Sequence, residues 1–473
     1  MTFVSKYLGT KDFWKRALVL ALPIAMQNML TSSFSLIDTI MVGQLGDVAL
    51  SAVGMAGQWS WLLNIVIFGV CSGTSVLVSQ YWGAKDINQI HRVSGLAILV
   101  GLIVSTIFVI TGLLFPETVV TIFNRNSSVI EKGSAYLRIA CLSYPGTVIN
   151  TILCSILRST ERVKLPVLTA LITTVLNVIL DYVLIFGAFG IPAMGIEGAA
   201  IATCISAWLG PVILIGVALA KKDILLHCFA GILKIDKGLI RIFSSTAIPV
   251  LFNESLWGFG TFLYNVIFAN LGYENYAAVT ILKTIGNLAY VFFIGMCNAC
   301  CVIVGKEIGG GNIKRSVDDA RRFAVTIPLL GIVIGAGIIV LRPYLIGLFN
   351  FSGELTEKTL YAAMTISLIY AIELAVKNIS YTFIVGVFRS GGDTVNGAKI
   401  DIMSMWLVAL PITAIAAFII KLPFPVVFAI SYLAEDYIKA TMSIRHFISC
   451  KWIKPVTQQG RENLEIFIQS KAK

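Results

Sequence analysis

The sequence is dominated by apolar runs of about 20 residues, each long enough to cross a hydrocarbon core of about 30 Å. Of the 473 residues, 57% are hydrophobic and only 13% are charged, and the mean hydropathy is +0.87. A soluble domain usually contains about 25% charged residues. We therefore expect an all-α polytopic membrane protein. A membrane β-barrel is excluded, because its strands would alternate in polarity over about ten residues and these runs do not.

About twelve such runs can be placed along the chain, and they predict the positions of its transmembrane helices. They lie near residues 17–41, 54–80, 94–115, 134–157, 166–187, 197–220, 244–270, 278–305, 323–345, 359–388, 400–420 and 425–445.

The net charge of +11 follows the loops between these runs. If the N-terminus is cytoplasmic, most lysines and arginines fall in cytoplasmic loops, as the positive-inside rule requires. Examples are Arg16, Arg92, Lys164, Lys222 and Arg315. We therefore expect a multi-pass protein of the inner (plasma) membrane with both termini in the cytoplasm. The basic excess indicates topology, and we expect no nucleic-acid partner.

The two halves of the sequence look like copies of one another. Matching residues recur at a constant shift of 226 and, after a small insertion, of 231. The pairs at 226 are Pro23 with Pro249, Leu45 with Leu271, Gly69 with Gly295 and Gly83 with Gly309, and Arg158 matches Arg389 at 231. Each copy contains six predicted helices, so both have the same orientation in the membrane, as in carriers built from parallel repeats.

This duplication predicts two pseudo-symmetric six-helix lobes around a central cavity. We expect an N-lobe over 1–220, a cytoplasmic linker over 221–243, a C-lobe over 244–450 and a cytoplasmic tail over 451–473. Rocking of the lobes would open the cavity to alternate sides. Pro23 interrupts the first helix and is a candidate hinge, because a proline within a helix frees a carbonyl group and permits bending.

Two acids lie inside apolar helices of the N-lobe, where an ionised carboxylate is costly and indicates a functional site. Asp38 lies late in the first helix, and Asp181 shares a helix face with Asn177 four residues earlier. Thr203 belongs to the same polar set, which the C-lobe copy lacks. Two carboxylates, an amide and a hydroxyl offer hard oxygen ligands for Na⁺, or can share a proton. The alternative is a structural hydrogen-bond network between helices.

Other polar residues in the spans are candidates for the wall of the cavity, although each could equally serve packing. They are Gln27, Asn28, Gln58, Asn150, Glu254 and Glu373. In the C-lobe, opposite charges four residues apart also suggest structural ion pairs. The sequence leaves open whether Glu254, Glu373, Glu435 and Asp436 form a second cation site or such pairs.

The chain resembles the multidrug and toxic compound extrusion (MATE) family over roughly residues 12–445. The resemblance rests on the motifs Leu22-Pro23, Ile37-Asp38-Thr39, Leu157-Arg158-Ser159, Asn177-x-x-x-Asp181, Gly198–Thr203 and Phe388–Asp393. It implies an exporter that exchanges drugs or metabolites for Na⁺ or H⁺. It also implies that Asp38, Asn177, Asp181 and Thr203 form the cation site, and that Pro23 is a kink proposed to change on protonation.

The resemblance extends only in part to the C-lobe. Glu254 is similar to an acid in the seventh helix of the NorM-type branch. The second acid of that branch is replaced here by Asn378, which favours the N-lobe as the cation site.

We expect a cation-coupled antiporter that needs no cofactor besides its coupling ion. Its substrates would be amphipathic, cationic small molecules, and it would work as a monomer within the bilayer. The alternative function is that of a lipid or lipid-linked oligosaccharide flippase of the same superfamily. A channel fits isolated acids in a duplicated bundle less well. A membrane-embedded enzyme would need clustered His, Cys or Asp at an interface, and the sequence offers no such cluster.

Overall fold

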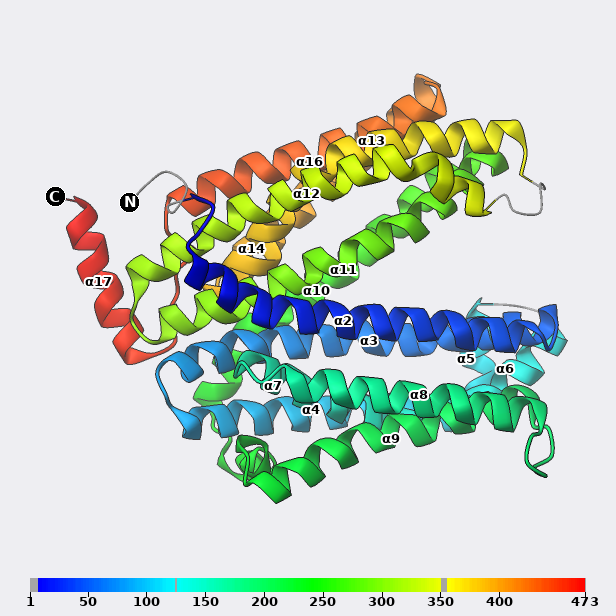
Figure 1. The fold of residues 1–473 in the computed structure, drawn as a ribbon, viewed down its shortest axis with the longest axis horizontal. Coiled ribbons are helices and arrows are strands. Elements are labelled where there is room, and N and C mark those ends of the chain that lie inside the picture. Colours follow the sequence, from blue (N-terminus) through cyan, green and yellow to red (C-terminus); the bar gives the residue numbers. More distant parts are fainter. Residues whose placement is uncertain (1–6, 124–125, 350–354, 473) are drawn as a thin grey trace. The chain divides into compact units, whose positions relative to one another are not determined.

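The computed structural model describes residues 7–123, 126–349 and 355–472, and within these ranges the chain is helical, with a lone bridge between Gly392 and Ile453 instead of a sheet (Figure 1). The outer ends of the predicted N-lobe and tail, 1–6 and 473, lie outside the described residues. The first half contains α2 (Lys11–Gly43), α3 (Asp47–Gly83), α4 (Ile87–Leu114), α5 (Pro116–Phe123), α6 (Ser127–Ala140), η1 (Cys141–Ser143), α7 (Tyr144–Ser159), α8 (Lys164–Phe186) and α9 (Gly195–Lys221).

Two short turns, η2 (Ile224–His227) and η3 (Ala230–Lys234), connect the halves. The second half contains α10 (Lys237–Asn270), α11 (Tyr273–Gly309), α12 (Ile313–Phe349), α13 (Glu357–Tyr381), η4 (Thr382–Phe388), α14 (Thr394–Ile402), η5 (Met403–Ala409), α15 (Leu410–Ala414), η6 (Ile415–Ile419), α16 (Phe424–Ile448) and α17 (Gln458–Ala472). The segments η4, η5 and η6 are π-helices.

Among the described residues, ten helical segments are long and apolar enough to cross a membrane. The helices α10 and α16 are not among these ten, although they contain 34 and 25 residues. The reason is the polar residues that they carry near their middles. Asn253 and Glu254 lie within α10, and Glu435, Asp436 and Lys439 lie within α16. With these two, the helices correspond to the twelve predicted runs, and the all-α fold is confirmed.

The duplication is confirmed at the level of helix boundaries. The helices α2, α3 and α4 begin at residues 11, 47 and 87, and α10, α11 and α12 begin at 237, 273 and 313, each 226 residues later. Both α3 and α11 are 37 residues long. Equal spacing over three consecutive helices shows that the repeated sequence encodes a repeated structure.

The chain forms two compact units, which are divided inside helices and not at the linker. One unit contains residues 26–251, and the other joins the residues up to 25 with those from 252 onward. Both divisions lie just after a proline, Pro23 in α2 and Pro249 in α10, and they too are 226 residues apart. We call residues 26–251 the N-unit and the other unit the C-unit. The lobe limits read from the sequence stay a prediction.

Close helix contacts explain why the first part of α2 belongs to a different unit from the rest of α2. The same explanation holds for the first part of α10. In the C-unit, a Cβ atom on Gly295 would lie 2.7 Å from the carbonyl oxygen of Ala21. In the N-unit, a Cβ atom on Gly73 would lie 2.7 Å from the Cβ atom of Ala247. Only glycine permits these backbones to approach so closely, as at other small-residue contacts between membrane helices.

The segment after α16 is attached to the C-unit by a cluster around Asp393. This buried carboxylate accepts hydrogen bonds from Lys454 at 2.7 Å and from Asn396 at 2.9 Å, and it lies 2.6 Å from His446. Burial alone would raise the pKa of Asp393, but the hydrogen bonds from these three side chains outweigh it and hold the pKa below its usual value. The neighbouring Trp452 is fully buried. The predicted cytoplasmic tail is therefore docked on the helical bundle.

Candidate functional site

The four residues of the predicted cation site all belong to the N-unit. Asp38 lies on α2, Asn177 and Asp181 lie one turn apart on α8, and Thr203 lies on α9. The helices α8 and α9 form a close pair. Gly187 ends α8 in a left-handed conformation with φ 76°, and a Cβ atom on Gly198 would lie 2.6 Å from the carbonyl of Leu184. These glycines therefore let α9 return along α8.

The structure brings three of the four residues together around a fifth one, Tyr136 of α6. Asp38 and Asp181 interact electrostatically with each other, and both act on Tyr136. The side chain of Thr203 also interacts with that of Tyr136. Asn177 is half-buried one turn before Asp181 on the same helix. The site is thus a polar group built from α2, α6, α8 and α9.

The two acids lack partners that would compensate their charge. Asp181 is fully buried, and neither of its carboxylate oxygens has a hydrogen-bond partner among the described residues. One oxygen of the half-buried Asp38, Oδ1, is also buried without a partner. No lysine, arginine or histidine of the described residues is in an ion pair with either acid. An unpaired buried carboxylate is very costly, so these groups need a proton or a bound cation.

An apolar cluster covers this site toward the α2–α3 and α8–α9 turns. It contains the buried residues Val42, Ala49, Ile185, Ile196 and Ala199. Three of them lie four residues from a site residue along its own helix, which places them one helical turn away. Tyr136 packs against the same cluster. The polar group is therefore sealed by hydrocarbon on the side of these turns.

The donor set fits a hard monovalent cation or a proton better than a transition metal. Two carboxylates, an amide and hydroxyl groups supply oxygen only, which hard cations prefer. Within the described residues, no group of three or more His, Cys, Asp and Glu side chains is arranged to hold a metal ion.

Gln27 and Asn28 are half-buried neighbours on α2, in the same unit. Gln27 accepts a hydrogen bond of 3.2 Å from the guanidinium of Arg158 on α7. Pro23 lies one turn earlier on α2, inside a helix that continues on both sides of it.

The two other N-unit candidates lie apart from this pair. Gln58 is exposed on α3. Asn150 on α7 packs against α9, because a Cβ atom on Gly210 would lie 2.7 Å from its Oδ1 atom. Packing between helices is thus one role that Asn150 fills.

The two C-unit candidates differ in their partners. Glu254 of α10 forms an ion pair of 2.6 Å with Arg389, whose side chain is only 6% exposed. Glu373 of α13 is 6% exposed, and its Oε2 atom has no partner among the described residues. In the same unit Lys439 pairs with Asp401 and with Glu435. Glu254 and Glu435 are therefore in ion pairs. For these two residues the sequence had left open either a second cation site or structural ion pairs.

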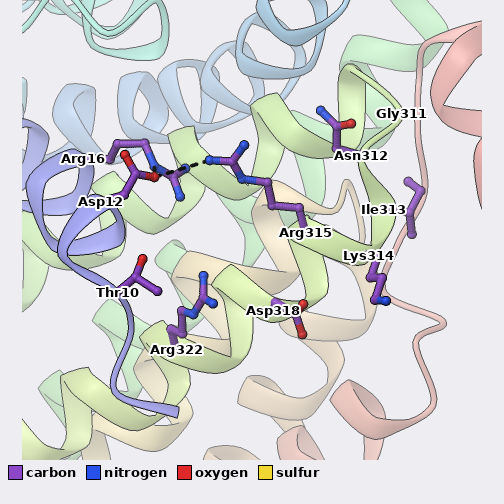
Figure 2. A pocket seen from close by; sticks show the side chains of 10 residues that line it. All are labelled: Thr10, Asp12, Arg16, Gly311, Asn312, Ile313, Lys314, Arg315, Asp318 and Arg322. Atoms are coloured by element: carbon purple, nitrogen blue, oxygen red, sulfur yellow. Dashed lines mark hydrogen bonds and ion pairs between the residues drawn. The ribbon is translucent and has the colours of Figure 1, made fainter. Parts of the chain in front are cut away.

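A polar pocket of about 510 Å³ lies where α2 begins, within the C-unit (Figure 2). Asp12 lies between two arginines, 3.1 Å from Arg16 and 3.5 Å from Arg315 (Figure 2). Arg16 also pairs with the fully buried Asp319 at 3.0 Å. These ion pairs attach the start of α2 to α12. The pocket is lined by Thr10, Asp12, Arg16, Gly311, Asn312, Ile313, Lys314, Arg315, Asp318 and Arg322.

Sequence reasoning missed Tyr136, because a tyrosine within an apolar helix carries no sign of its neighbours. A residue of α6 that lies near Asp38 and Asp181 can be identified only when the packing of α6 against α2 and α8 is known. It also missed the pairing of Glu254 with Arg389, although both residues had been singled out.

A sequence model of the MatE family matches the chain twice, over residues 23–183 and 249–415. The two matches begin at the equivalent prolines Pro23 and Pro249. The chain is 25% identical over 449 residues to a probable multidrug resistance protein NorM of Thermotoga maritima, with 93% of each chain covered. It is also 25% identical to the probable multidrug resistance protein YoeA of Bacillus subtilis, over 91% of this chain and 94% of that one.

Solved structures agree with this match at the level of the fold. A crystal structure of a MATE protein in the bent conformation superposes with a TM-score of 0.82 and 18% identity, over 98% of both chains. The MATE transporter VcmN of Vibrio cholerae in its bent form gives a TM-score of 0.83 at 18% identity, over 94% of this chain and 99% of that one. With the family match covering more than half of its length, the chain belongs to the MatE family.

Proposed function

We propose that this protein exports amphipathic small molecules, preferably cations, by exchanging them for Na⁺ or H⁺. The observation that carries the proposal is Asp181, a fully buried carboxylate that has neither a hydrogen-bond partner nor an ion pair among the described residues. An uncompensated charge is costly there, and we infer that a positive species neutralises it by binding and leaving. The curated relatives named above are described as probable multidrug resistance proteins, which supports drugs or metabolites as the cargo.

Exchange at Asp38 and Asp181 supplies the driving force. One net charge that crosses a membrane potential of 100 mV contributes about 2.3 kcal/mol, which applies when the cargo is neutral. When one monovalent cationic cargo leaves as one cation enters, the charges cancel and the concentration gradient of the coupling ion supplies the driving force. Coupling between two sites is commonly about 1–3 kcal/mol, so one cation suffices to lower the affinity for cargo. Asn177, Thr203 and Tyr136 would orient or ligate the cation. Besides the cargo, the proposed mechanism requires only the coupling cation, with no other cofactor and no chemical reaction.

Alternating access would use the two prolines. Each proline removes one backbone hydrogen bond from its helix, and the compact units are divided two residues later in both α2 and α10. We propose that Pro23 and Pro249 are paired hinges. The candidate contacts for the cargo are Gln27, Asn28, Gln58 and Asn150 in the N-unit and Glu254 and Glu373 in the C-unit.

The charge distribution supports an orientation with both termini in the cytoplasm of the cell that carries the protein in its plasma membrane. Under this orientation the α2–α3 and α8–α9 turns face outward, and the apolar cluster around Ile185 closes the cation site on that side. A monomer is sufficient, since all parts of the proposed mechanism belong to one chain.

The test is counterflow of a fluorescent organic cation in proteoliposomes, driven by a pH gradient or by a Na⁺ gradient in separate arms. Asp181→Asn should abolish counterflow in whichever arm the wild type uses, and should leave the protein folded and inserted. Asp236→Asn, a change in the exposed connecting segment, is the control and should transport normally. Wild-type rates in Asp181→Asn would refute the proposal. Gradient-independent movement of a labelled lipid would instead indicate a flippase.

A further inference from the structure

The ammonium group of Lys377 lies within a box of three tyrosine rings in the C-unit. Its Nζ atom lies 5.2 Å from the ring centre of Tyr290, 5.6 Å from that of Tyr370 and 5.2 Å from that of Tyr432. The rings come from α11, α13 and α16, so three helices converge on one cation. Distances below about 6 Å from a ring centre give a favourable cation–π interaction, and such boxes recognise ammonium groups.

Two acids supply negative charge beside this box. Asp436 of α16 is 5% exposed and interacts electrostatically with Lys377 and with Glu373. Glu373 lies one turn before Lys377 on α13, and its Oε2 atom is buried without a partner. Lys439 also acts on Asp436, but its ammonium is in contact with Asp401 and Glu435. Of these two lysines, Lys377 is the one without an ion pair among the described residues.

The contacts of Lys377 are unusual for a lysine that is not fully exposed. Within the described part of the chain, its ammonium donates no hydrogen bond and forms no ion pair within 4 Å. An ammonium has three N–H donors and is strongly hydrated, so it normally finds oxygen acceptors. Here ring faces hold it, as they would hold a cation without donors.

The acids of the two units differ in whether a basic side chain compensates their charge. In the N-unit, Asp38 and Asp181 have no basic partner among the described residues. In the C-unit, Glu254 has Arg389, Glu435 has Lys439, and Asp436 has Lys377 nearby. At the shifts of 226 and 231 that relate the repeats, none of these three bases except Arg389 has a basic counterpart.

We propose that the C-unit contains a site for an ammonium-type cation that the chain itself fills with Lys377. The box formed by Tyr290, Tyr370 and Tyr432, with the charges of Asp436 and Glu373, would hold a small organic ammonium if the lysine were absent. This inference rests on the proposed function in one respect: it leaves the N-unit as the place where the exchangeable cation binds. The tethered lysine cannot dissociate, so the C-unit site stays loaded during transport.

The test uses the purified full-length protein in detergent and radiolabelled tetramethylammonium, an organic cation that has no N–H donors and binds to ring faces. Lys377→Met keeps the length of the side chain and removes its charge. This variant should bind about one tetramethylammonium per chain, and about tenfold more tightly than the wild type does. Lys377→Gln is the second variant, in case the apolar side chain itself fills the box.

Two further variants locate the binding. Adding Tyr432→Leu to Lys377→Met should return the affinity to the wild-type value, because one ring face is lost. Adding Asp181→Asn to Lys377→Met should change nothing, so the outcome does not depend on whether the N-unit functions as proposed. Equal binding by wild type and both folded Lys377 variants would overturn the inference. So would tight binding by Lys377→Met that survives loss of the Tyr432 ring.

Discussion

The ion pair between Glu254 and Arg389 should contribute measurably to stability, and the repeat provides its own control. Its atoms are 2.6 Å apart, and the two side chains are 24% and 6% exposed. Removing one partner of a buried pair costs about 3–5 kcal/mol. Arg389 retains a further interaction after the loss of Glu254, which reduces this cost. Since Glu254 is partly exposed, water can enter after its removal, and we expect Glu254→Leu to cost about 3 kcal/mol.

Glu254→Gln should cost less, about 1 kcal/mol, because the amide oxygen still accepts a hydrogen bond from the guanidinium. The N-unit already uses this arrangement, with Gln27 accepting from Arg158 at 3.2 Å. The two variants should therefore differ by about 2 kcal/mol, which corresponds to roughly a thirtyfold change in the unfolding equilibrium.

The assay is reversible unfolding of the purified protein in dodecyl maltoside by titration with sodium dodecyl sulfate, followed by tryptophan fluorescence. Gln27→Leu is the matched control in the other unit and should cost about 1 kcal/mol, since it removes one hydrogen bond to a half-buried arginine. The reasoning fails if Glu254→Leu and Glu254→Gln both lie within about 0.5 kcal/mol of the wild type.

Three further outcomes follow from the structure. The lowered pKa of Asp393 stabilises the docked tail above the pH at which an unfolded aspartate titrates, about 4. Tail docking should weaken as pH falls below this value, detected as faster cleavage by pepsin, and Asp393→Asn should dock poorly at every pH. Lys439→Met leaves Asp401 and Glu435 buried together and should cost about 3–5 kcal/mol, partly recovered by adding Glu435→Gln. Ile185→Ala should cost about 2–4 kcal/mol and increase uncoupled proton leak in proteoliposomes, whereas Ile185→Val should cost about 1 kcal/mol.

The helices and their duplication could be predicted from the sequence because both depend on local or periodic information. A run of apolar residues must form a helix in lipid, since only internal hydrogen bonds satisfy its backbone. The constant shift of 226 residues then predicted that helices begin at equivalent positions in the two halves of the chain. The position of Asp181 was predicted as well, because a charge within an apolar run is visible without any knowledge of packing.

Contacts between helices were far less predictable. Tyr136 and Asp38 are almost a hundred residues apart, and nothing in either segment specifies that they meet. The tyrosines around Lys377 are spread over three helices and read individually as ordinary membrane aromatics. Pairs within one helix, such as Glu435 with Lys439, are easier to predict because the spacing of four residues places them on one face.

The helix α2 links the candidate cation site to the proposed hinge through one continuous element. Asp38 lies 15 residues after Pro23, which corresponds to about 22 Å of helix. On the other side of Pro23, ion pairs from Arg16 to the buried Asp319 hold the helix in the C-unit. If the segment from Pro23 to Asp38 moves as one rigid helix, a cation that repositions Asp38 would act on the proposed hinge at Pro23. The helix α10 has the same proline and the same division but carries Tyr264 in the place of Asp38, bonded to Glu435 at 2.9 Å. The hydrogen bond between Tyr264 and Glu435 therefore holds α10 in position. We infer that the cation drives motion through α2 and that α10 follows.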